Sequence, residues 1–257
     1  MNVIQQLSLE GKKALVTGGG SGIGRSITHA LAEAGADVAV IDINTELAKK
    51  VVDEVKKIGR ESFFIRADVC KYEDIENMAN EIVKTFGRLD IAVNNAGISC
   101  RGNAENLDID DWDRVINLNL RGSFLCAQKE AKIMIPQKYG KIIFTSSISS
   151  SIINIPQFHI AYGASKAGID HLVKGLAVEW IKHGVYVNGI NPGAIYTPFV
   201  KNAKDLKDLI KIWEEYYPIK RLGYPEEIKG AVVYLASDAS NFTVGHNLVI
   251  DGGYTCL

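Results

Sequence analysis

The stretch Lys-Ala-Leu-Val-Thr-Gly-Gly-Gly-Ser-Gly-Ile-Gly occupies residues 13–24. Its first five residues form a short apolar strand, and apolar residues at helical spacing follow over Arg25–Ala34, which Gly35 ends as a C-cap. A second apolar strand, Ala36–Asp42, completes a β–α–β unit. Glycines between a strand and a helix let phosphate oxygens approach backbone N–H groups and the positive helix N-terminus. The stretch therefore predicts a phosphate-binding turn, and it begins the strand and helix alternation of the whole chain.

The same alternation continues towards the C-terminus, without a linker or a shift in composition that would divide the chain. Further strands are expected at Ser62–Arg66, Leu89–Val93, Lys141–Thr145, Val185–Ile190 and Asn247–Ile250, and helices at Thr45–Ile58, Tyr72–Phe86, Asp110–Ile135, Ala161–His183 and Pro225–Ala236. Alternating strands and helices favour a parallel sheet that is covered on both faces. The sequence predicts one α/β domain over residues 1–257, with a Rossmann-like, doubly wound, seven-stranded parallel sheet between two helix layers.

Composition excludes several classes of protein. The 257 residues are 47% apolar and carry a net charge of −1, so there is no basic footprint for nucleic acid or for a membrane surface. The N-terminal residues lack a signal-peptide run, and no stretch approaches the ~20 apolar residues of a membrane span. The cysteines form no metal-binding pattern and predict reduced thiols, at Cys70, Cys100, Cys126 and Cys256. We expect a cytoplasmic protein with no metal, nucleic-acid or membrane partner.

The glycine spacing and the acid that follows it indicate which cofactor the turn would bind. The pattern Gly18-x3-Gly22-x-Gly24 is not the usual GxGxxG fingerprint. Asp42 ends the second strand, where a carboxylate can bind the hydroxyls of an adenosine ribose and repel a 2′-phosphate. The glycine loop and residues 43–44 contain no Arg or Lys. The pattern favours NAD over NADP, and a solvated Asp beside a tight turn is the structural alternative.

A second stretch, Ala-Tyr-Gly-Ala-Ser-Lys-Ala at residues 161–167, contains a candidate acid/base pair. In a helix, Tyr162 and Lys166 lie on one face, one turn apart. A free tyrosine has a pKa of about 10, and a cation within roughly 4–6 Å lowers the pKa of the phenol. The spacing predicts a tyrosine that exchanges protons near neutral pH, although such pairs also occur on ordinary helix surfaces.

Four short motifs occur in a fixed order along the chain: Thr17-Gly18-x3-Gly22-Ile23-Gly24, Asn94-Asn95-Ala96-Gly97, Tyr162-x3-Lys166 and Pro192-Gly193. With these motifs the chain resembles the short-chain dehydrogenase/reductase family, of the single-domain type, from about Leu9 to Tyr254. The resemblance implies an enzyme that interconverts a secondary alcohol and a ketone by hydride transfer with NAD(P). The segment 154–159 and the C-terminal segments 236–242 and 251–254 resemble those of sugar-alcohol and sugar-acid dehydrogenases, so the expected substrate is a polyol, sugar or sugar acid.

The resemblance assigns catalytic roles residue by residue. Tyr162 matches the acid/base, and Lys166 matches its partner, which also binds the nicotinamide ribose. The serine of the family is the second of the pair after its strand, which is Ser147 here, with Ser149 as the alternative in a run of five serines. Asn119 precedes Leu-x-Gly and matches the asparagine that, in a locally bent helix, holds a water beside Lys166.

The resemblance also implies a set of cofactor-binding residues. Asp68 and Val69 match the position that contacts adenine, and a helix cap is the alternative for Asp68. The backbone of Ile195 matches the carboxamide site, and Thr197 matches a residue that braces the cofactor. The full set is Gly18, Ser21, Gly22, Ile23, Gly24, Asp42, Asp68, Val69, Asn95, Ala96, Gly97, Tyr162, Lys166, Pro192, Gly193, Ile195 and Thr197.

Substrate contacts are expected from the serine run and from the loop before Tyr162, at Ser149, Asn154, Gln157 and His159. Residues of about 198–221 match a mobile lid of relatives, with Lys201, Lys204, Asp205, Lys207, Asp208 and Lys211 and the aromatic residues Trp213, Tyr216 and Tyr217. The resemblance further implies a homotetramer in which the helices expected at Asp110–Ile135 and Ala161–His183 pair across a two-fold axis. The second helix has an apolar set for this contact, at Ile169, Leu172, Val173 and Leu176.

Two other functions remain open from the sequence. A 3-oxoacyl thioester (acyl-carrier-protein) reductase is common on this scaffold, but such enzymes usually prefer NADP, against which Asp42 argues. A non-catalytic NAD-sensing scaffold protein would need the glycine loop but would have no use for Ser147, Tyr162 and Lys166.

Overall fold

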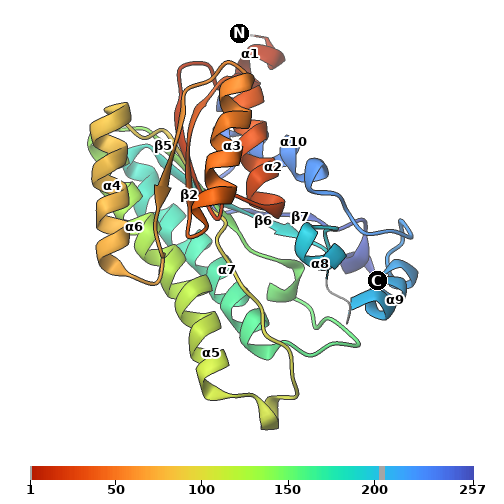
Figure 1. The fold of residues 1–257 in the computed structure, drawn as a ribbon. Coiled ribbons are helices and arrows are strands. Elements are labelled where there is room, and N and C mark those ends of the chain that lie inside the picture. The colour runs from red at the N-terminus through yellow and green to blue at the C-terminus, as the bar shows by residue number, and fades with distance from the viewer. Residues whose placement is uncertain (1, 203–205) are drawn as a thin grey trace.

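The computed structural model describes residues 2–202 and 206–257. Within these residues the strands form one seven-stranded sheet in the order β3-β2-β1-β4-β5-β6-β7, and every neighbouring pair is parallel (Figure 1). The strands are β1 (Lys13–Thr17), β2 (Asp37–Asp42), β3 (Ser62–Arg66), β4 (Ile91–Asn94), β5 (Gly140–Thr145), β6 (Val185–Pro192) and β7 (Asn247–Ile250). The predicted sheet, its parallel sense and the number of strands are confirmed.

The helices cover both faces of this sheet. They are α1 (Val3–Leu7), α2 (Gly22–Glu33), α3 (Thr45–Lys57), α4 (Tyr72–Phe86), α5 (Ile109–Ile116), α6 (Ser123–Gln137), α7 (Ile160–Trp180), α8 (Pro198–Asn202), α9 (Lys207–Tyr216) and α10 (Lys229–Ala236). Buried residues of α4, α6 and α7 form one apolar cluster with the sheet, and those of α2, α3 and α10 form the other. The predicted three-layer α/β/α arrangement is therefore confirmed.

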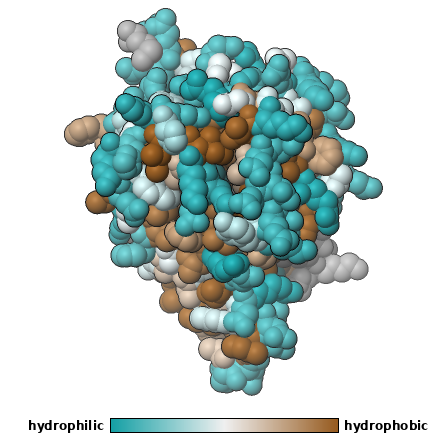
Figure 2. All heavy atoms as spheres, turned by 90° about the vertical axis from the view of Figure 1, so that its left-hand side faces the viewer, coloured by the Kyte–Doolittle hydropathy of each residue, from teal (hydrophilic) through white to brown (hydrophobic). Residues whose placement is uncertain are grey.

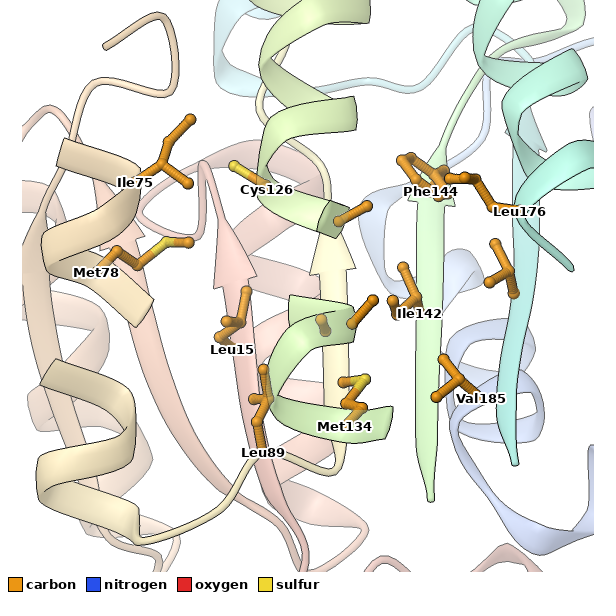
Figure 3. Packing of buried hydrophobic residues seen from close by; sticks show 14 of the residues in the cluster. Leu15, Ile75, Met78, Leu89, Cys126, Met134, Ile142, Phe144, Leu176 and Val185 are labelled. Atoms are coloured by element: carbon orange, nitrogen blue, oxygen red, sulfur yellow. The ribbon is translucent and has the colours of Figure 1, made fainter. Parts of the chain in front are cut away.

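Strands β1 to β6 supply both apolar clusters because neighbouring side chains point to opposite faces of a sheet. Leu15 belongs to the cluster beneath α4, α6 and α7, and the next residue, Val16, belongs to the cluster on the opposite face. Figure 3 shows the first cluster, in which Met134 of α6 and Ile142 of β5 lie among the labelled side chains. Full burial of one such side chain contributes about 1.5–3 kcal/mol. Both faces of these strands must be apolar, which explains the short, uninterrupted apolar runs of the sequence.

The long helix expected at Asp110–Ile135 is not uniform. It begins with α5, opens into a π-helical segment at Asn117–Gly122 and continues as α6 to Gln137. A π-helical turn contains one more residue than an α-helical turn, and such turns frequently occur at functional sites. The predicted helix was correct in extent, and the local change at Asn117–Gly122 supplies the bend that the family resemblance required.

The lid region of about residues 198–221 contains α8 and α9, which lie apart from the two helix layers and beside the C-terminus (Figure 1). Lys204 and Asp205, two of its predicted charged residues, lie outside the described residues. Tyr217 follows α9 and is 3% exposed, with its ring against that of Tyr254. The turn after the last strand and the lid therefore share an aromatic contact.

The strand order places the glycine loop at the centre of the sheet. Chain connections run from β1 towards β3 on one side and from β4 towards β7 on the other, so the carboxyl ends of β1 and β4 are neighbours at the point where the order reverses. In open α/β sheets, ligands bind in the crevice at this point. None of the helices in the described part of the chain is long and apolar enough to cross a membrane.

Candidate active site

The glycine loop between β1 and α2 has a backbone that requires glycine at several positions. Gly18 (φ +63°) and Gly22 (φ +51°) lie in the left-handed region that residues with a Cβ rarely adopt. A Cβ on Gly24 would overlap the carbonyl oxygen of Gly18. Ser21 is the N-cap of α2, but its side chain makes no capping hydrogen bond. The first N–H groups of α2 therefore lack that partner and fit the phosphate oxygens of a cofactor.

The loop after β4 is hydrogen-bonded to the end of β1. The hydroxyl oxygen of Thr17 accepts hydrogen bonds from the backbone N–H groups of Asn95 (3.0 Å) and Ala96 (3.1 Å). The side-chain amide of Asn95 donates to the carbonyl oxygens of Thr17 (3.1 Å) and Gly18 (3.3 Å). These contacts hold the two predicted cofactor segments against each other.

Asp42 lies where the sequence placed it, at the end of β2 and beside the glycine loop. One carboxylate oxygen accepts a hydrogen bond from the Gly20 N–H at 2.9 Å, and the other accepts from the Asn44 N–H at 2.8 Å. Arg25, the first cation after the loop, is paired with Glu54 at 2.8 Å. The loop therefore presents a fixed carboxylate, and its nearest guanidinium in the sequence already has an anionic partner.

The predicted adenine position also has a clear structure. The Asp68 carboxylate accepts a hydrogen bond from the Cys70 N–H at 3.0 Å, so it stabilises the turn before α4. Val69 is 7% exposed, and Ile23 of α2 packs on the apolar cluster of α2, α3 and α10. Val69 is thus mostly buried in the apolar cluster of α4, α6 and α7, while the Asp68 side chain is already engaged in a turn.

Pro192 is the last residue of β6, and the predicted carboxamide segment follows it. The Gly193 N–H donates to the Ile250 carbonyl of β7 at 2.9 Å, and Ile195 forms a bridge to Gly223. A Cβ on Gly22 would lie 3.4 Å from the Thr197 methyl group. The segment after β6 therefore approaches the glycine loop, as expected for two walls of one cofactor cleft.

Tyr162 and Ser147 meet at the carboxyl end of β5. Ser147 caps the start of the short 3-10 turn after β5 and is 7% exposed, while Tyr162 lies in the first turn of α7 and is half-buried. Burial raises the pKa of the Tyr162 phenol above its ordinary value, and a hydrogen bond with Ser147 partly offsets that increase. The two predicted catalytic side chains therefore lie close to each other.

The expectation that Lys166 lowers the pKa of Tyr162 does not hold for the protein alone. The Lys166 ammonium lies 5.4 Å from the centre of the Tyr162 ring and donates to the carbonyl oxygen of Thr145 at 2.7 Å. Burial lowers the pKa of Lys166 to about 8. A Cβ on Gly97 would lie 3.6 Å from this ammonium, so the loop after β4 lies directly beside Lys166. Burial therefore has the largest effect on the pKa of the phenol. The Lys166 ammonium is hydrogen-bonded to the Thr145 carbonyl and not to Tyr162.

Asn119 lies in the π-helical segment and is completely buried. Its side-chain oxygen accepts from the Ile98 N–H (2.9 Å), and its amide donates to the Ile98 carbonyl (2.9 Å) and to the Ser165 hydroxyl (3.0 Å). All of these partners are protein groups. Asn119 therefore joins the β4 loop to α7, next to Lys166.

Three of the four predicted substrate residues form a chain of hydrogen bonds from Ser147. The Ser147 hydroxyl donates to Ser149 at 3.1 Å, and the Ser149 hydroxyl donates to the Asn154 oxygen at 2.5 Å. Since a carbonyl oxygen only accepts, His159 donates to the same atom from Nε2 at 3.0 Å. Burial lowers the pKa of His159, and its ring lies 5.2 Å from that of Tyr162.

Beside this chain lies a cavity of about 670 Å³. Its wall includes Ser149, Asn154 and His159 together with apolar residues such as Ile152 and Phe158. The fourth predicted residue, Gln157, is not among the residues of this wall. Its side-chain oxygen accepts from Trp213 Nε1 at 2.9 Å, so Gln157 connects the loop to α9.

Two features of this region were missed by the analysis of the sequence. The Tyr217 hydroxyl contacts the Ala194 N–H, beside the segment expected to bind the carboxamide. Asp170, one turn after Lys166, contacts Asn191 of β6. The spacing of Asp170 from Lys166 was visible in the sequence, whereas the contact of Tyr217 depends on how the lid packs.

Comparison with known proteins identifies the family. A family model described as enoyl-(acyl carrier protein) reductase matches residues 18–255. A sorbose reductase of Candida albicans is 40% identical over 99% of this chain and 91% of its own length. The chain belongs to the short-chain dehydrogenase/reductase family.

Solved structures agree with this membership. A short-chain type dehydrogenase/reductase from Mycobacterium marinum is 40% identical, covers 100% of both chains and superposes with a TM-score of 0.96. A gluconate 5-dehydrogenase from Burkholderia cenocepacia, in complex with NADP and tartrate, is 32% identical over 100% of both chains, with a TM-score of 0.92. The chain is therefore an oxidoreductase that acts on CH–OH groups with a nicotinamide cofactor, and the resemblance found in the sequence is confirmed.

Proposed function

We propose that this protein is an NAD-dependent dehydrogenase of a polyol, sugar or sugar acid, interconverting a secondary alcohol and a ketone. The observation that carries the proposal is the meeting of Ser147, Tyr162 and Lys166 beside the loop that fits a dinucleotide. The names of the related sorbose reductase and gluconate dehydrogenase support the substrate class. A polyhydroxylated substrate also suits a wall that combines Ser149, Asn154 and His159.

The chemistry of the chain's own residues follows from this geometry. Ser147 and Tyr162 hydrogen-bond one oxygen of the substrate, and Tyr162 removes or returns its proton. Lys166 places an ammonium one helical turn away, 5.4 Å from the centre of the Tyr162 ring and hydrogen-bonded to the Thr145 carbonyl, where it would bind the ribose of the cofactor. Bound NAD(H) would supply the hydride chemistry. The protein therefore positions two reactants and moves one proton.

The choice of NAD over NADP rests on Asp42. Its carboxylate is oriented by two backbone N–H groups, and Arg25 is occupied by Glu54. A fixed negative charge repels a 2′-phosphate, while a carboxylate accepts hydrogen bonds from ribose hydroxyls. The related gluconate dehydrogenase was solved with NADP, so cofactor preference has to be measured directly on this protein.

The test is a panel of polyols, sugars, sugar acids and 3-oxoacyl thioesters, assayed with both cofactors by the absorbance of the reduced nicotinamide. We expect turnover of a polyol, sugar or sugar acid with NAD. Tyr162→Phe should lower kcat by about 10²–10⁴ while the thermal unfolding temperature and NADH binding are retained. Near-normal turnover by Tyr162→Phe would contradict the acid/base assignment.

Substitution of Lys166 separates charge from shape. Lys166→Met removes the ammonium, so we expect weaker cofactor binding and a lower kcat. Lys166→Arg retains the charge but not the compact ammonium geometry, and partial recovery is the most that we expect. The matched measurements are NADH titration by fluorescence and the pH dependence of kcat.

The same panel tests the two alternatives. The description of the family model names a reductase of acyl-carrier-protein substrates, so preferred turnover of a 3-oxoacyl thioester would replace our proposal. Binding of NADH without turnover of any panel member would favour the NAD-sensing scaffold. The placement of Ser147 beside Tyr162 argues against the scaffold, because binding alone does not require it.

We also propose that the protein acts as a cytoplasmic homotetramer. The apolar set expected to pair between subunits was wrong in part, because Ile169, Val173 and Leu176 are buried in the protein's own core. Val178 of α7 is 78% exposed and is available instead. Figure 2 shows hydrophobic residues gathered on the lower part of the face that carries α4, α5 and α6. A monomer in light scattering at micromolar concentration would refute the tetramer.

A further inference from the structure

Helix α7 contains a third polar residue in line with the proposed catalytic pair. Asp170 follows Lys166 by one turn, as Lys166 follows Tyr162, so the three side chains share a face of the helix. Asp170 Oδ2 accepts a hydrogen bond from Asn191 Nδ2 at 2.9 Å. Its other oxygen, Oδ1, is buried and has no hydrogen-bond partner among the described residues. The carboxylate is therefore held in place by one strong contact.

Asn191 continues this contact towards the catalytic serine. It lies in β6, is 3% exposed, and also donates from Nδ2 to the Ser150 hydroxyl at 3.1 Å. The Ser150 hydroxyl donates to the backbone carbonyl oxygen of Ser147 at 2.7 Å. Asp170, Asn191 and Ser150 thus form a polar bridge from α7 to the main chain of Ser147. We call these three residues the Asp170 bridge.

Asp170 also acts on Lys166 through its charge. Burial lowers the pKa of Lys166, and the negative charge of Asp170 raises it. The other groups around this ammonium are uncharged: the Thr145 carbonyl of β5, the Asn119 amide of the π-helical segment and the Tyr162 phenol of α7.

Two further elements border the pair. The β4 loop approaches Lys166 through Gly97, which has no side chain. The loop before α7 places the His159 ring against Tyr162, and burial lowers the pKa of that imidazole, which favours its neutral form. Among the described residues, Asp170 is thus the anion that acts on the catalytic ammonium.

We propose that Asp170 is a positioning residue that keeps Lys166 charged and, through the Asp170 bridge, fixes the main chain at Ser147. The inference rests on the proposed function, because it assumes that Tyr162 and Lys166 are the acid/base pair. It adds a residue that the family motifs in this chain do not contain. Its two parts, charge and position, are separable by experiment.

The charge part predicts the direction of a pH shift. A negative charge disfavours proton loss from a nearby ammonium, so removal of the Asp170 charge lowers the pKa of Lys166. Asp170→Asn, which retains the shape, should move the Lys166 ionisation to lower pH by about one unit.

The direct measurement is the titration of Lys166 by NMR in the cofactor-free protein labelled at the lysine side-chain carbons, with Lys166→Met assigning the signal. We expect Asp170→Asn to shift this titration to lower pH and Asp170→Glu to restore it. Glu179→Gln removes an exposed carboxylate from the same helix and should leave the titration unchanged. The pH profile of kcat should move in the same direction when a substrate is known.

The position part is tested by Ser150→Ala, which breaks the bridge without changing charge. We expect a lower kcat, a pH profile that stays in place, and an unfolding temperature within a few degrees of the wild type. Should Asp170→Asn fail to fold, Asp170→Ser replaces it, because a smaller uncharged side chain should produce the same shift.

An Asp170→Asn titration that superposes on the wild-type curve would overturn the inference. That outcome differs from failure of the proposed function, in which Tyr162→Phe would retain turnover whatever the titration shows. A downward shift in Glu179→Gln equal to that in Asp170→Asn would also overturn it, because the effect would then be one of overall charge.

Discussion

The two ends of the active-site cleft are built in different ways. At the cofactor end, the glycine loop and the β4 loop are held by backbone hydrogen bonds and by Thr17 and Asn95, directly at the ends of central strands. At the substrate end, Ser149, Asn154 and His159 are held by each other's side chains, on a short 3-10 turn and the loop that follows it. The cofactor end is thus held by the backbone of the sheet, whereas the substrate end is held by contacts between side chains. This difference predicts that substitutions at the cofactor end affect folding as well as binding.

The largest effect is expected from a substitution in the glycine loop itself. In Gly24→Ala the new Cβ would overlap the carbonyl of Gly18, so the loop must move or the helix must start later. We expect a loss of stability of about 1–3 kcal/mol or more and little NADH binding. Thermal unfolding and NADH fluorescence titration measure both.

Gly230→Ala is the matched control for this substitution. Gly230 lies in α10, and a Cβ there would meet no heavy atom within 4 Å. Alanine stabilises a helix interior by roughly 0.5–1 kcal/mol relative to glycine, so the control should be neutral or slightly more stable. Equal behaviour of the two variants would show that the glycine loop is not rigid.

A second prediction concerns the support beneath the cofactor end. Glu130 of α6 is 1% exposed, and its partner is the Asn94 amide at the end of β4, at 2.8 Å. Burial raises the pKa of Glu130 to about 8. The folded state therefore binds this proton more tightly than the unfolded chain, whose carboxyl has a pKa of about 4.3. The contribution of Glu130 to the free energy of unfolding is therefore fully present below about pH 4.3, the pKa of the carboxyl in the unfolded chain. It is lost as the pH rises towards 8.

Glu130→Gln retains the shape of the neutral acid and cannot ionise. We expect its free energy of unfolding to fall less than that of the wild type between pH 5 and 8, by a difference of about 1 kcal/mol or more. Urea denaturation at several pH values measures it, with Glu179→Gln as an exposed control. If the free energy of unfolding of Glu130→Gln changed with pH as much as that of the wild type, Glu130 would not be protonated in the folded protein.

A third and smaller effect is expected in the choice of cofactor. Asp42→Ala combined with Ile43→Arg removes the repulsion of a 2′-phosphate and adds a cation beside it. We expect the ratio of kcat/KM for NAD to that for NADP to fall by about tenfold or more, which corresponds to about 1.4 kcal/mol. Steady-state kinetics with both cofactors measure the ratio. A wild-type enzyme that uses NADP at least as well as NAD would refute the role of Asp42.

The smallest effect is expected at the substrate end. Gln157→Met removes the hydrogen bond to Trp213 and leaves the side chain's length nearly unchanged. A single hydrogen bond contributes about 0.5–1.5 kcal/mol, so KM for the substrate should rise about 2–10-fold with little change in stability or NADH binding. If this contact carries the effect, Trp213→Phe adds nothing to Gln157→Met in a double-mutant cycle. Loss of stability in Gln157→Met would show that the substrate end is also part of the fold.

Local patterns in the sequence were sufficient for the fold. Apolar runs of strand length separated by helical periodicity predicted the seven strands, because a parallel sheet must be apolar on both faces. The glycine positions and the spacing of Tyr162 and Lys166 were equally local. The irregular helix turn at Asn117–Gly122, the helices α1, α8 and α9, and the ends of elements came from the structure.

By itself, the sequence determined the class of fold, the family and the identity of the residues that surround the cleft. Tertiary structure alone decided what those residues do to each other: that burial raises the pKa of Tyr162, that Lys166 is bonded to Thr145, that Gln157 faces α9, and that Asp170 reaches Ser147 through Asn191. The physical reason is that motifs and periodicity are properties of neighbours in the chain. Desolvation and hydrogen bonds between loops depend on contacts between residues far apart in the sequence, which no local pattern records.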